Sequence, residues 1–233
     1  VDWALAEGVY VTINAHHDDW IKQNPLDVSA QNRFDSIWLA VSQRFKQKSA
    51  RLILEILNEP HKMTVPQLNS LNRRILSIIR NQTPNRLVVF AGTEWSSITE
   101  LEQIAIPNVN DGFLIANFHH YEPWNFAGEC VAQWGSQIDQ TAVDEIYQRA
   151  YQWSLSNDIP VMVNEFGVAK YDHQKPENRC QQSQREAYIE QHVKSAKSYG
   201  IAHTFWDDGG SFSTYDRASG TWGAMKDVLL FNQ

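Results

Sequence analysis

The sequence predicts an α/β protein in which parallel strands alternate with helices around a barrel. Three observations support this fold class. Six apolar runs of strand length alternate with segments of helical periodicity along the chain. No glycine-rich phosphate loop occurs among these strand–helix units, which favours a barrel over a dinucleotide-binding sheet. Polar residues gather where the apolar runs end, and the beginnings of the runs carry no comparable cluster.

Length and composition suit one domain over residues 1–233 that binds neither nucleic acid nor a membrane. A single α/β barrel commonly reaches this length, and no linker or low-complexity tract divides the chain. The hydrophobic content of 42% is ample for a core. The formal net charge of −7 opposes binding to a nucleic-acid backbone or an anionic membrane surface. No apolar run is long enough to predict a membrane-spanning helix.

The predicted strands are apolar runs rich in β-branched residues. Such runs, when helices separate them, are typical of strands that pair in parallel and are buried on both faces. The six strands are predicted at Tyr10–His16, Leu52–Glu59, Leu87–Gly92, Phe113–Tyr121, Pro160–Phe166 and Ala202–Trp206.

Helices are predicted where apolar residues recur at the i, i+3, i+4, i+7 spacing. These segments are 34–45, 66–79, 141–155 and 183–199. The last opens with Ser183 and Glu186 at capping-box spacing and stops at Gly200. A further helix precedes the first strand and ends at Gly8, whereas 93–110 carries little helical signal. The stretch TYDRASGTWG predicts a hairpin-like turn.

Every predicted strand ends on residues that can do chemistry. These are His16, His17 and Asp18; Asn58 and Glu59; Glu94 and Trp95; His119, His120 and Tyr121; Asn164 and Glu165; and Trp206, Asp207 and Asp208. In a barrel of parallel strands the carboxyl ends share one face, and barrel enzymes keep their active sites there. The asymmetry between strand ends therefore predicts an active site.

Two of these ends repeat the same dipeptide, in LILEILNEPH (Asn58-Glu59) and in PVMVNEFG (Asn164-Glu165). Cleavage of a glycosidic bond needs two carboxyl groups, because one protonates the leaving oxygen while the other attacks or activates water. Repulsion between such carboxylates and their partial burial keep a proton on one of them near neutral pH. The simpler alternative is that each acid only caps the helix that follows it.

Aromatic residues and the two cysteines add less specific signals. The nine Trp residues are expected mainly in the core, and the remainder can serve as flat platforms on which a sugar ring stacks. Cys130 and Cys180 lie fifty residues apart without metal-ligand spacing. One disulfide and two free thiols both fit this pattern.

Five stretches together resemble glycoside hydrolase family five, the cellulase-type retaining enzymes. They are ILNEP, VNEFG, INAHHDDW, HHYEPWNF and FWDDGGSFSTYDR, and the resemblance extends over residues 3–223. It implies a TIM-type (β/α)8 barrel and a double-displacement mechanism without a cofactor or metal. Glu59 matches the general acid/base, and Glu165 matches the nucleophile. Asn58 matches the amide that binds the sugar 2-hydroxyl.

The resemblance also implies supporting residues around the two acids. His16 matches the family histidine at the end of the third strand, and His17 is its neighbour. His119 and Tyr121 match a His-x-Tyr pair whose side chains point to one side of the strand. Tyr121 is therefore expected to donate a hydrogen bond to Glu165.

Further residues are expected to contact the substrate. Trp206 matches the platform under the sugar at the cleavage site, and Asp207 is a candidate ligand for sugar hydroxyls. His17, Trp124 and Trp20 are candidates for substrate subsites. Simple packing is the alternative for both tryptophans.

The chain departs from the family pattern at its N-terminal side. The family has eight strands, and the sequence predicts six, so the first two strands and the first helix, roughly 60 residues, are expected to be absent. With them goes the second-strand arginine that would hold Glu165 ionised. The two unpaired edge strands are templates for association. We expect an open barrel filled by side chains, a homo-oligomer through the exposed edges, or a fragment completed elsewhere.

The function predicted from these features is a retaining endo-β-1,4-glucanase. Mixed-linkage glucan, xyloglucan and mannan are alternative substrates. A catalytically impaired carbohydrate-binding protein is an alternative of another class, and so is a metal-dependent hydrolase that uses His16, His17, Asp18 and His119. A polymeric substrate implies a secreted or periplasmic protein.

Overall fold

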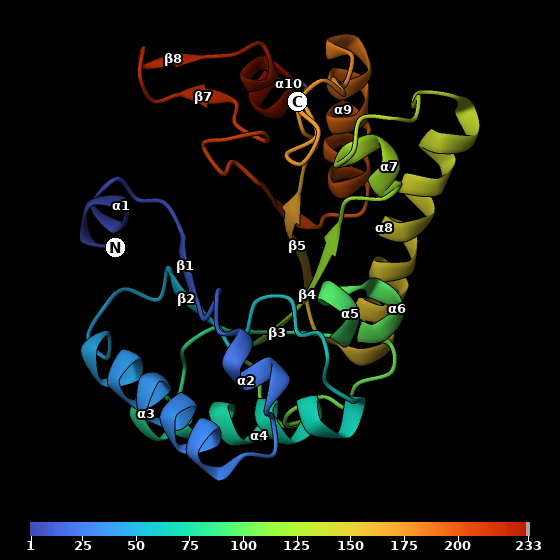
Figure 1. Cartoon of the computed structure of the whole chain (residues 1–233). Helices are drawn as coiled ribbons and strands as arrows, with labels where there is room; N and C mark the ends of the chain where they lie inside the picture. Colours follow the sequence, from blue (N-terminus) through green and yellow to red (C-terminus); the bar gives the residue numbers. More distant parts are fainter. Residues whose placement is uncertain (232–233) are drawn as a thin grey trace. The chain divides into compact units, whose positions relative to one another are not determined.

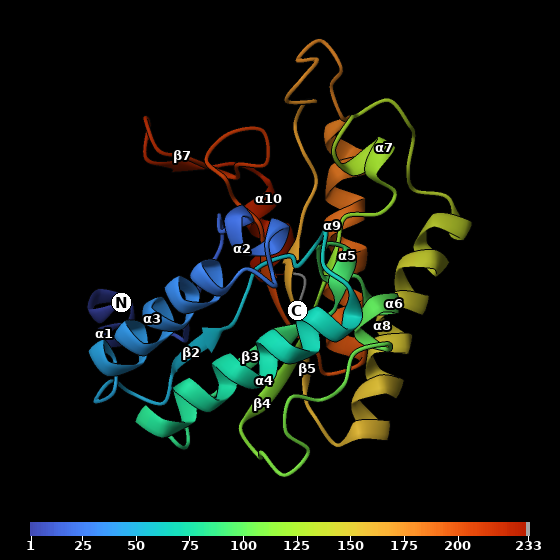
Figure 2. The same cartoon turned by 60° about the horizontal axis from the view of Figure 1, so that its bottom comes forward.

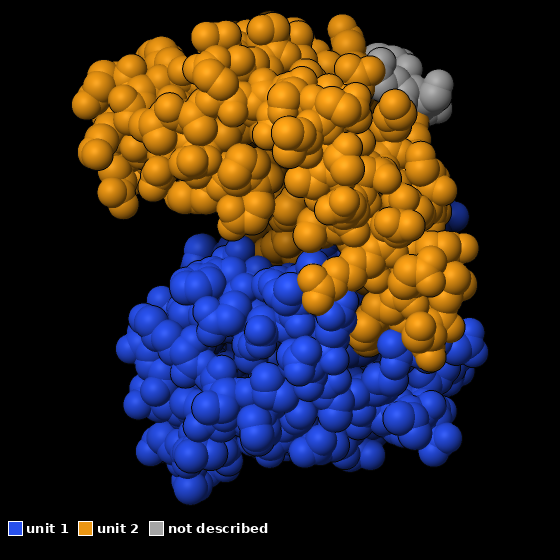
Figure 3. Space-filling view, turned by 90° about the vertical axis from the view of Figure 1, so that its right-hand side faces the viewer, with its two compact units in different colours: residues 1–118, 157–160 blue, residues 119–156, 161–233 orange. Residues whose placement is uncertain are grey.

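The computed structural model describes residues 1–231, in which strands and helices alternate along the chain (Figure 1). The chain forms two compact units, coloured separately in Figure 3. Unit 1 comprises residues 1–118 and 157–160, and unit 2 comprises residues 119–156 and the chain from Val161 onward. No helix among the described residues combines the length and the apolar character needed to span a bilayer.

All six predicted strands are confirmed, and within each unit they lie in the order of the chain. They are β1 (Val11–Asn14), β2 (Leu52–Glu55), β3 (Val88–Ala91), β4 (Leu114–His120), β5 (Val161–Phe166) and β6 (Ala202–Phe205). Most are shorter at the carboxyl end than predicted, because the backbone turns away before the polar residues. The fold class is α/β with six parallel strands, a truncated (β/α) barrel, as the sequence predicts.

The strands of unit 1 pair in parallel from β1 to the first part of β4. Val11 of β1 pairs with Leu52 of β2, Leu54 of β2 with Val88 of β3, and Val88 in turn with Leu114 of β4. All residues of β2 and β3 are buried. Their near-continuous apolar sequences LILE and VVFA are those of a sheet covered on both faces.

The helices of unit 1 are α1 (Asp2–Ala6), α2 (Asp19–Gln23), α3 (Val28–Arg44), α4 (Val65–Gln82), α5 (Thr93–Ser96) and α6 (Ile98–Leu101). The two long helices lie side by side, as Figure 2 shows, and bury their apolar stripes. Trp38 of α3 is buried and donates a hydrogen bond from Nε1 to the carbonyl of Ile56 at 3.1 Å. Helix α3 begins six residues before the predicted segment because the Asp27 carboxylate accepts a hydrogen bond from the Ala30 N–H at 2.7 Å, capping the helix.

Unit 2 contains the end of β4, the parallel pair of β5 and β6, and four helices. The helices are α7 (Trp124–Ala127), α8 (Gln137–Asn157), α9 (Gln182–Ser198) and α10 (Met225–Phe231). The predicted hairpin is confirmed as β7 (Tyr215–Asp216) paired antiparallel with β8 (Thr221–Trp222). Cys130 and Cys180 form a disulfide, which decides between the two alternatives left by the sequence.

The predicted capping box of helix α9 is wrong. The helix begins one residue earlier than predicted, with Gln181 as its N-cap, so Ser183 lies inside the first turn. Glu186 instead accepts a hydrogen bond from the side chain of Gln182 at 2.7 Å, a pairing of residues four apart on the helix surface. The predicted stop is confirmed, because Gly200 follows the helix with φ +65°, a conformation that glycine adopts without strain.

Candidate active site

In unit 1, Asn58 is buried at the point where the chain leaves β2. Its N–H donates to the carbonyl of Ala15 at 2.9 Å, which ties it to the segment that follows β1. Asn58 is only 2% exposed, and its Oδ1 atom accepts no hydrogen bond from the described residues. A buried amide oxygen without a donor is costly to the fold. The position of Asn58 therefore favours a ligand that brings a hydroxyl donor.

Glu59 sits on a turn with unusual backbone geometry. Its φ is 45°, in the left-handed region that residues other than glycine seldom adopt, and Lys62 follows with φ 56°. Such conformations cost on the order of 1–3 kcal/mol each and cluster at functional sites. Pro60 after Glu59 has no backbone N–H to donate, so the chain cannot resume strand pairing at this residue. The turn lies beyond the end of β2 and carries Glu59 half-buried.

A second strained turn, after β3, packs against the first. Glu94, Trp95 and Ser96 all have positive φ. The Trp95 N–H donates to the Pro60 carbonyl at 3.3 Å, and its indole stacks on the ring of His61 with centroids 5.2 Å apart. Trp95 is 54% exposed. The two turns therefore present an exposed aromatic surface beside the backbone that carries Glu59.

A buried carboxylate lies beneath this turn and was not singled out from the sequence. Glu55 of β2 is 1% exposed and accepts hydrogen bonds from Asn14 Nδ2 at 3.1 Å and from Asn117 Nδ2 at 3.2 Å. Asn14 Nδ2 also lies 3.3 Å from His16 Nδ1. Glu55 thus links β1, β2 and β4 inside unit 1. The signal available in the sequence was an acid within the apolar run LILEIL.

The other predicted residues of unit 1 follow β1. His16 is half-buried and His17 is exposed, with their rings edge to face at 4.6 Å. Trp20 donates from Nε1 to Asp18 at 2.9 Å, and the guanidinium of Arg33 lies 4.2 Å from the centre of its ring. Packing against α3 therefore accounts for part of the Trp20 ring, and its contact with substrate stays a prediction.

In unit 2, Glu165 lies at an irregularity of β5. Val163 pairs with His203 and Phe166 pairs with Phe205, so β5 has one residue more than β6 between these pairs. Such a β-bulge re-aims side chains and is common next to active sites. The hydroxyl of Thr204 donates to the Asn164 carbonyl at 2.9 Å within this irregular stretch. The bulge therefore places the second Asn-Glu dipeptide where the regular alternation of β5 is broken.

The His-x-Tyr pair and Glu165 come together in unit 2, as the resemblance implies. Glu165 is 8% exposed, and the Tyr121 hydroxyl donates to its Oε2 atom at 3.0 Å. Nδ1 of the buried His119 lies 3.5 Å from the same oxygen. A phenol that donates to a carboxylate favours its ionised form. The arrangement suits a fixed, negatively charged carboxylate.

Aromatic side chains surround Tyr121. Its ring meets Trp124 edge to face at 6.2 Å and Phe212 edge to face at 5.8 Å, while Trp124 and Phe212 stack at 6.4 Å. A Cβ atom at Gly167 would lie 3.2 Å from Phe212 and 3.4 Å from Tyr121. Trp124 is 47% exposed, and its substrate subsite stays a prediction. Phe212 was not singled out from the sequence.

Trp206 and Asp207 follow β6 and are half-buried. Asp207 Oδ2 accepts hydrogen bonds from the Thr214 N–H at 2.8 Å, the Thr214 hydroxyl at 3.0 Å and the Tyr215 N–H at 3.1 Å, and Oδ1 accepts from the Gly209 N–H at 2.8 Å. Burial alone would raise the pKa of Asp207, but the donors from Thr214, Gly209 and Tyr215 outweigh it and hold the pKa below its ordinary value. These contacts make Asp207 the anchor of a loop.

A buried histidine cluster lies in unit 2 behind the Glu165 strand. The hydroxyl of Tyr147 and Nδ1 of His192 are 2.8 Å apart, and His192 stacks on Phe166 at 5.0 Å. Burial lowers the pKa of the neighbouring His120 to about 4. Burial, followed by the proximity of His120 and His203, lowers the pKa of His192 well below its ordinary value. His120 is therefore a neutral core residue.

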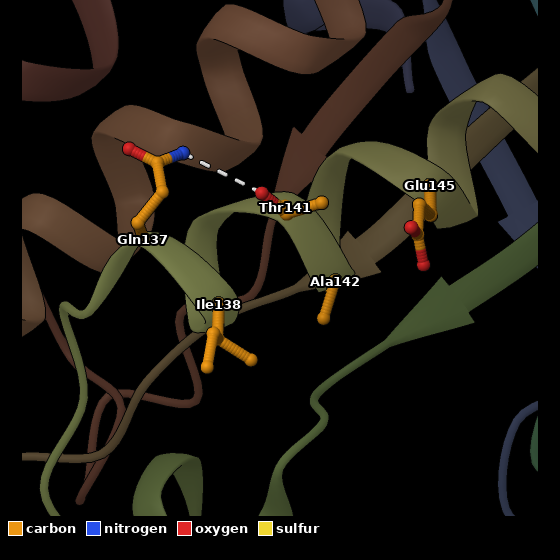
Figure 4. Close-up of a pocket in the computed structure, with 5 residues that line it drawn as sticks. All are labelled: Gln137, Ile138, Thr141, Ala142 and Glu145. Atoms are coloured by element: carbon orange, nitrogen blue, oxygen red, sulfur yellow. Dashed lines mark hydrogen bonds between the residues drawn. The ribbon is translucent and has the colours of Figure 1, made fainter.

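The pocket drawn in Figure 4 is separate from these residues. It lies along one face of α8 and is lined by Gln137, Ile138, Thr141, Ala142 and Glu145. Gln137 spans part of it by donating from Nε2 to the Thr141 hydroxyl at 3.4 Å. None of the predicted site residues lines it.

Parallel strands that alternate with helices place the chain in the α/β barrel class. The family model described as Cellulase (glycosyl hydrolase family 5) matches residues 1–211. The chain therefore belongs to the glycosyl hydrolase family 5 cellulases.

Curated relatives and solved structures agree with this family. Endoglucanase H of Acetivibrio thermocellus is 35% identical over 240 residues, and Endoglucanase B of Paenibacillus lautus is 29% identical over 254 residues. Both alignments cover 100% of this chain, but the chain spans only 25% of the first relative and 43% of the second. The structure of Thermotoga maritima Cel5A in complex with mannotriose is similar at a TM-score of 0.88 and 25% identity. That similarity covers 99% of this chain and 74% of the other.

Proposed function

We propose that this chain acts as a retaining endo-β-1,4-glucanase with Glu165 as nucleophile and Glu59 as general acid/base. The single observation that carries the proposal is the Glu165 carboxylate, which is buried at a strand end and accepts a hydrogen bond from Tyr121. Family membership and relatives named as endoglucanases support the same chemistry.

In the first step, a Glu165 carboxylate oxygen attacks the anomeric carbon of the glucosyl unit. The bond from that carbon to the glycosidic oxygen breaks, and Glu59 transfers its proton to the departing oxygen. The new bond is an ester between the sugar and Glu165. Tyr121 and His119, both close to Oε2 of Glu165, orient the carboxylate for this attack. Asn58 binds the 2-hydroxyl of the same sugar, which suits its buried Oδ1 atom.

In the second step, Glu59, now ionised, removes a proton from water. The resulting oxygen attacks the anomeric carbon, the ester bond breaks, and Glu165 leaves as a carboxylate. Two inversions at one carbon return the β configuration. Trp206 supports the sugar at the cleavage site, with His17, Trp20 and Trp124 as further proposed contacts. His16 is proposed to support catalysis.

The substrate is proposed to be a β-1,4-glucan, because the curated relatives are named endoglucanases. The solved structures of Thermotoga maritima Cel5A include one with cellobiose and one with mannotriose. Mannan therefore stays an alternative beside mixed-linkage glucan and xyloglucan. The exposed rings of Trp95 and Trp124 are the candidate stacking platforms on which this choice depends.

The test is reducing-sugar release from carboxymethylcellulose, lichenan, xyloglucan and mannan. Wild-type protein is expected to act on a glucan, and Glu59→Gln and Glu165→Gln are expected to abolish the activity. Glu94→Gln is the matched control, because Glu94 is an exposed acid at the end of β3 and is expected to be dispensable. Proton NMR of the first product should show the β anomer.

Three outcomes would overturn the proposal. A folded protein that binds but does not cleave these polymers would be a carbohydrate-binding protein. Activity that a chelator removes would favour a metal-dependent hydrolase. A first product in the α configuration would contradict retention.

We also propose that the protein works outside the cytoplasm, as a polymeric substrate requires. The Cys130–Cys180 disulfide supports this, since disulfides persist in oxidising compartments. The proposed homo-oligomer rests on exposed residues before β1, where Tyr10 is 67% exposed. A monomeric elution volume in gel filtration would contradict the oligomer.

A further inference from the structure

A loop after β6 packs against the tyrosine that contacts Glu165. We name residues 207–215 the anchor loop. Two neighbouring acids fold it, because Asp207 accepts hydrogen bonds from Gly209, Thr214 and Tyr215, and Asp208 accepts from the N–H of Gly210 at 2.6 Å. Asp208 Oδ1 also accepts from the Phe212 N–H at 3.1 Å.

The anchor loop is also tied to the segment that follows β5. The Lys170 N–H donates to the Ser211 carbonyl at 2.7 Å, and Lys170 Nζ donates to the Ser213 hydroxyl at 2.6 Å. Ser211 and Thr214 are buried at 5% and 7% exposure. Phe212 therefore lies in a loop whose two ends Asp207 joins, and Lys170 holds the residues on either side of Phe212 in the sequence.

The Phe212 ring is the direct neighbour of Tyr121 and Trp124. Its edge-to-face contact with Tyr121 and its stacking on Trp124 are arrangements that aromatic pairs prefer. Gly167, two residues after Glu165, leaves the space for the ring, since a Cβ there would meet Phe212 at 3.2 Å. The Tyr121 ring is thus restrained by its contacts with Phe212 and Trp124.

We propose that Asp207 and Phe212 are positioning residues for Glu165, Asp207 by folding the anchor loop and Phe212 by fixing the Tyr121 ring from that loop. This inference deepens the proposed function and rests on it for its activity readout. It gives Asp207 a role other than direct binding of sugar hydroxyls. It also explains why one aspartate accepts four hydrogen bonds from its own loop.

The first test compares Phe212→Leu with Tyr121→Phe and with the double variant. Tyr121→Phe removes a hydrogen bond to a charged group and is expected to lower kcat/KM roughly 10- to 100-fold. Phe212→Leu loosens that bond and is expected to lower kcat/KM about two- to tenfold. Both should move the acid limb of the pH profile to higher pH, by about half a unit to one unit for Phe212→Leu. Phe212→Tyr keeps the aromatic ring, so its kcat/KM and its acid limb should stay close to those of the wild type.

The double variant decides whether Phe212 acts through Tyr121. In the Tyr121→Phe background, Phe212→Leu should cause no further change in kcat/KM or in the acid limb. Independent, multiplicative losses would show that Phe212 has another role and would overturn its part of the inference.

Asp207→Asn tests the anchor. It is expected to move the acid limb to higher pH, as Phe212→Leu does. The double variant of Asp207→Asn and Phe212→Leu should have a kcat/KM no lower than that of either single variant. A raised KM with an unmoved acid limb, persisting in the Phe212→Leu background, would show that Asp207 binds substrate directly. Asp216→Asn is the matched control, because Asp216 is exposed and caps the β7–β8 turn through Ala218 and Ser219.

A readout that needs no activity separates this inference from the proposed function. The ¹³C shift of the Glu165 carboxyl carbon can be followed against pH in each folded variant. Its titration midpoint should rise in Phe212→Leu and Asp207→Asn, but not further when Tyr121→Phe is also present. If the wild type is inactive but the Glu165 midpoint rises in these variants, the proposed glycosidase function is rejected and the positioning role is kept. If the wild type is active but the midpoint does not rise, the positioning role is rejected and the glycosidase function is kept.

Discussion

The two Asn-Glu dipeptides have the same sequence pattern, but their acids are held in different ways. Glu165 lies in β5 and is fixed by side chains, since Tyr121 donates to it and His119 lies 3.5 Å away. Glu59 lies beyond β2 on a turn where its own φ is 45°. The strand-end pattern alone therefore does not show how an acid is presented.

The difference agrees with the proposed division of labour. A nucleophile must stay ionised and aimed at one carbon, and contacts to its oxygens do both. A general acid/base must exchange its proton with the leaving group and then with water, which suits a half-buried carboxyl on a turn. The two units are also stabilised differently, unit 1 by the hydrogen bonds of buried Glu55 and unit 2 by the Cys130–Cys180 disulfide.

The largest expected effect distinguishes the two acids by leaving group. On an aryl β-cellobioside with a poor leaving group, Glu59→Gln is expected to lower kcat/KM by about 10²–10⁴-fold, because protonation of the oxygen is lost. On the 2,4-dinitrophenyl β-cellobioside, whose leaving group departs without protonation, most of this loss should disappear. Glu165→Gln should be impaired on both, because the attacking oxygen is missing. Equal dependence on leaving group in the two variants would contradict the assignment.

The second prediction concerns the disulfide of unit 2. Replacing Cys130 and Cys180 together with Ser is expected to lower the free energy of unfolding by about 2–4 kcal/mol, because the unfolded chain gains the freedom of a long loop. Hydrogen exchange should become faster in peptides of unit 2, such as those around Phe126, whose carbonyl lies 3.1 Å from the Cys180 sulfur. Uniformly faster exchange across unit 1 would contradict a support specific to unit 2.

The third prediction is acid lability of unit 2. The folded-state pKa of His120 is lowered to about 4, below its unfolded value near 6.5. Between these values the unfolded chain binds more protons, so the free energy of unfolding falls as the pH falls from 6.5 toward 4. A shift of this size corresponds to roughly 3 kcal/mol for one histidine, and the lowered pKa of His192 adds to it.

Urea titrations at several pH values check this prediction. His120→Asn, if it folds, should flatten the pH dependence of the unfolding midpoint between pH 6.5 and 4. The control is His17→Asn in unit 1, where the histidine is exposed and the pH dependence should stay that of the wild type. An unchanged slope in His120→Asn would contradict the role of the buried cluster.

The fold was predictable from the sequence because its signals are local. Apolar runs such as LILEIL and VVFA are buried strands, and the helical stripe of 66–79 lies within α4. Helix starts were less predictable, because a cap depends on one side chain. Ser183 fits the capping pattern, yet the helix begins before it.

One contact between strand-end residues was predictable from the family pattern, whereas contacts with loops and between several strands were not. The Tyr121–Glu165 hydrogen bond was expected from the family pattern and is present. The contact of Phe212 with Tyr121 was not, because it joins positions ninety-one residues apart, and a phenylalanine in a loop carries no signal of its own. Glu55 was missed because its partners come from two other strands.

The last prediction concerns unit 1, where Glu55 links separate strands as the disulfide links separate segments of unit 2. Glu55→Gln keeps the size of the side chain but replaces one acceptor oxygen with a donor, which then faces the amide donor of Asn14 or Asn117. The expected loss in free energy of unfolding is about 1–3 kcal/mol, the range for leaving a buried donor or acceptor unsatisfied. Glu94→Gln, at an exposed position of the same unit, should leave stability unchanged.

Glu55→Gln should also lower activity, because Asn14 lies 3.3 Å from His16. Faster hydrogen exchange in this variant should be confined to β1, β2 and β4. A fully stable Glu55→Gln would mean that backbone pairing alone holds these strands, and the contrast between the two units would then rest on the turn at Glu59.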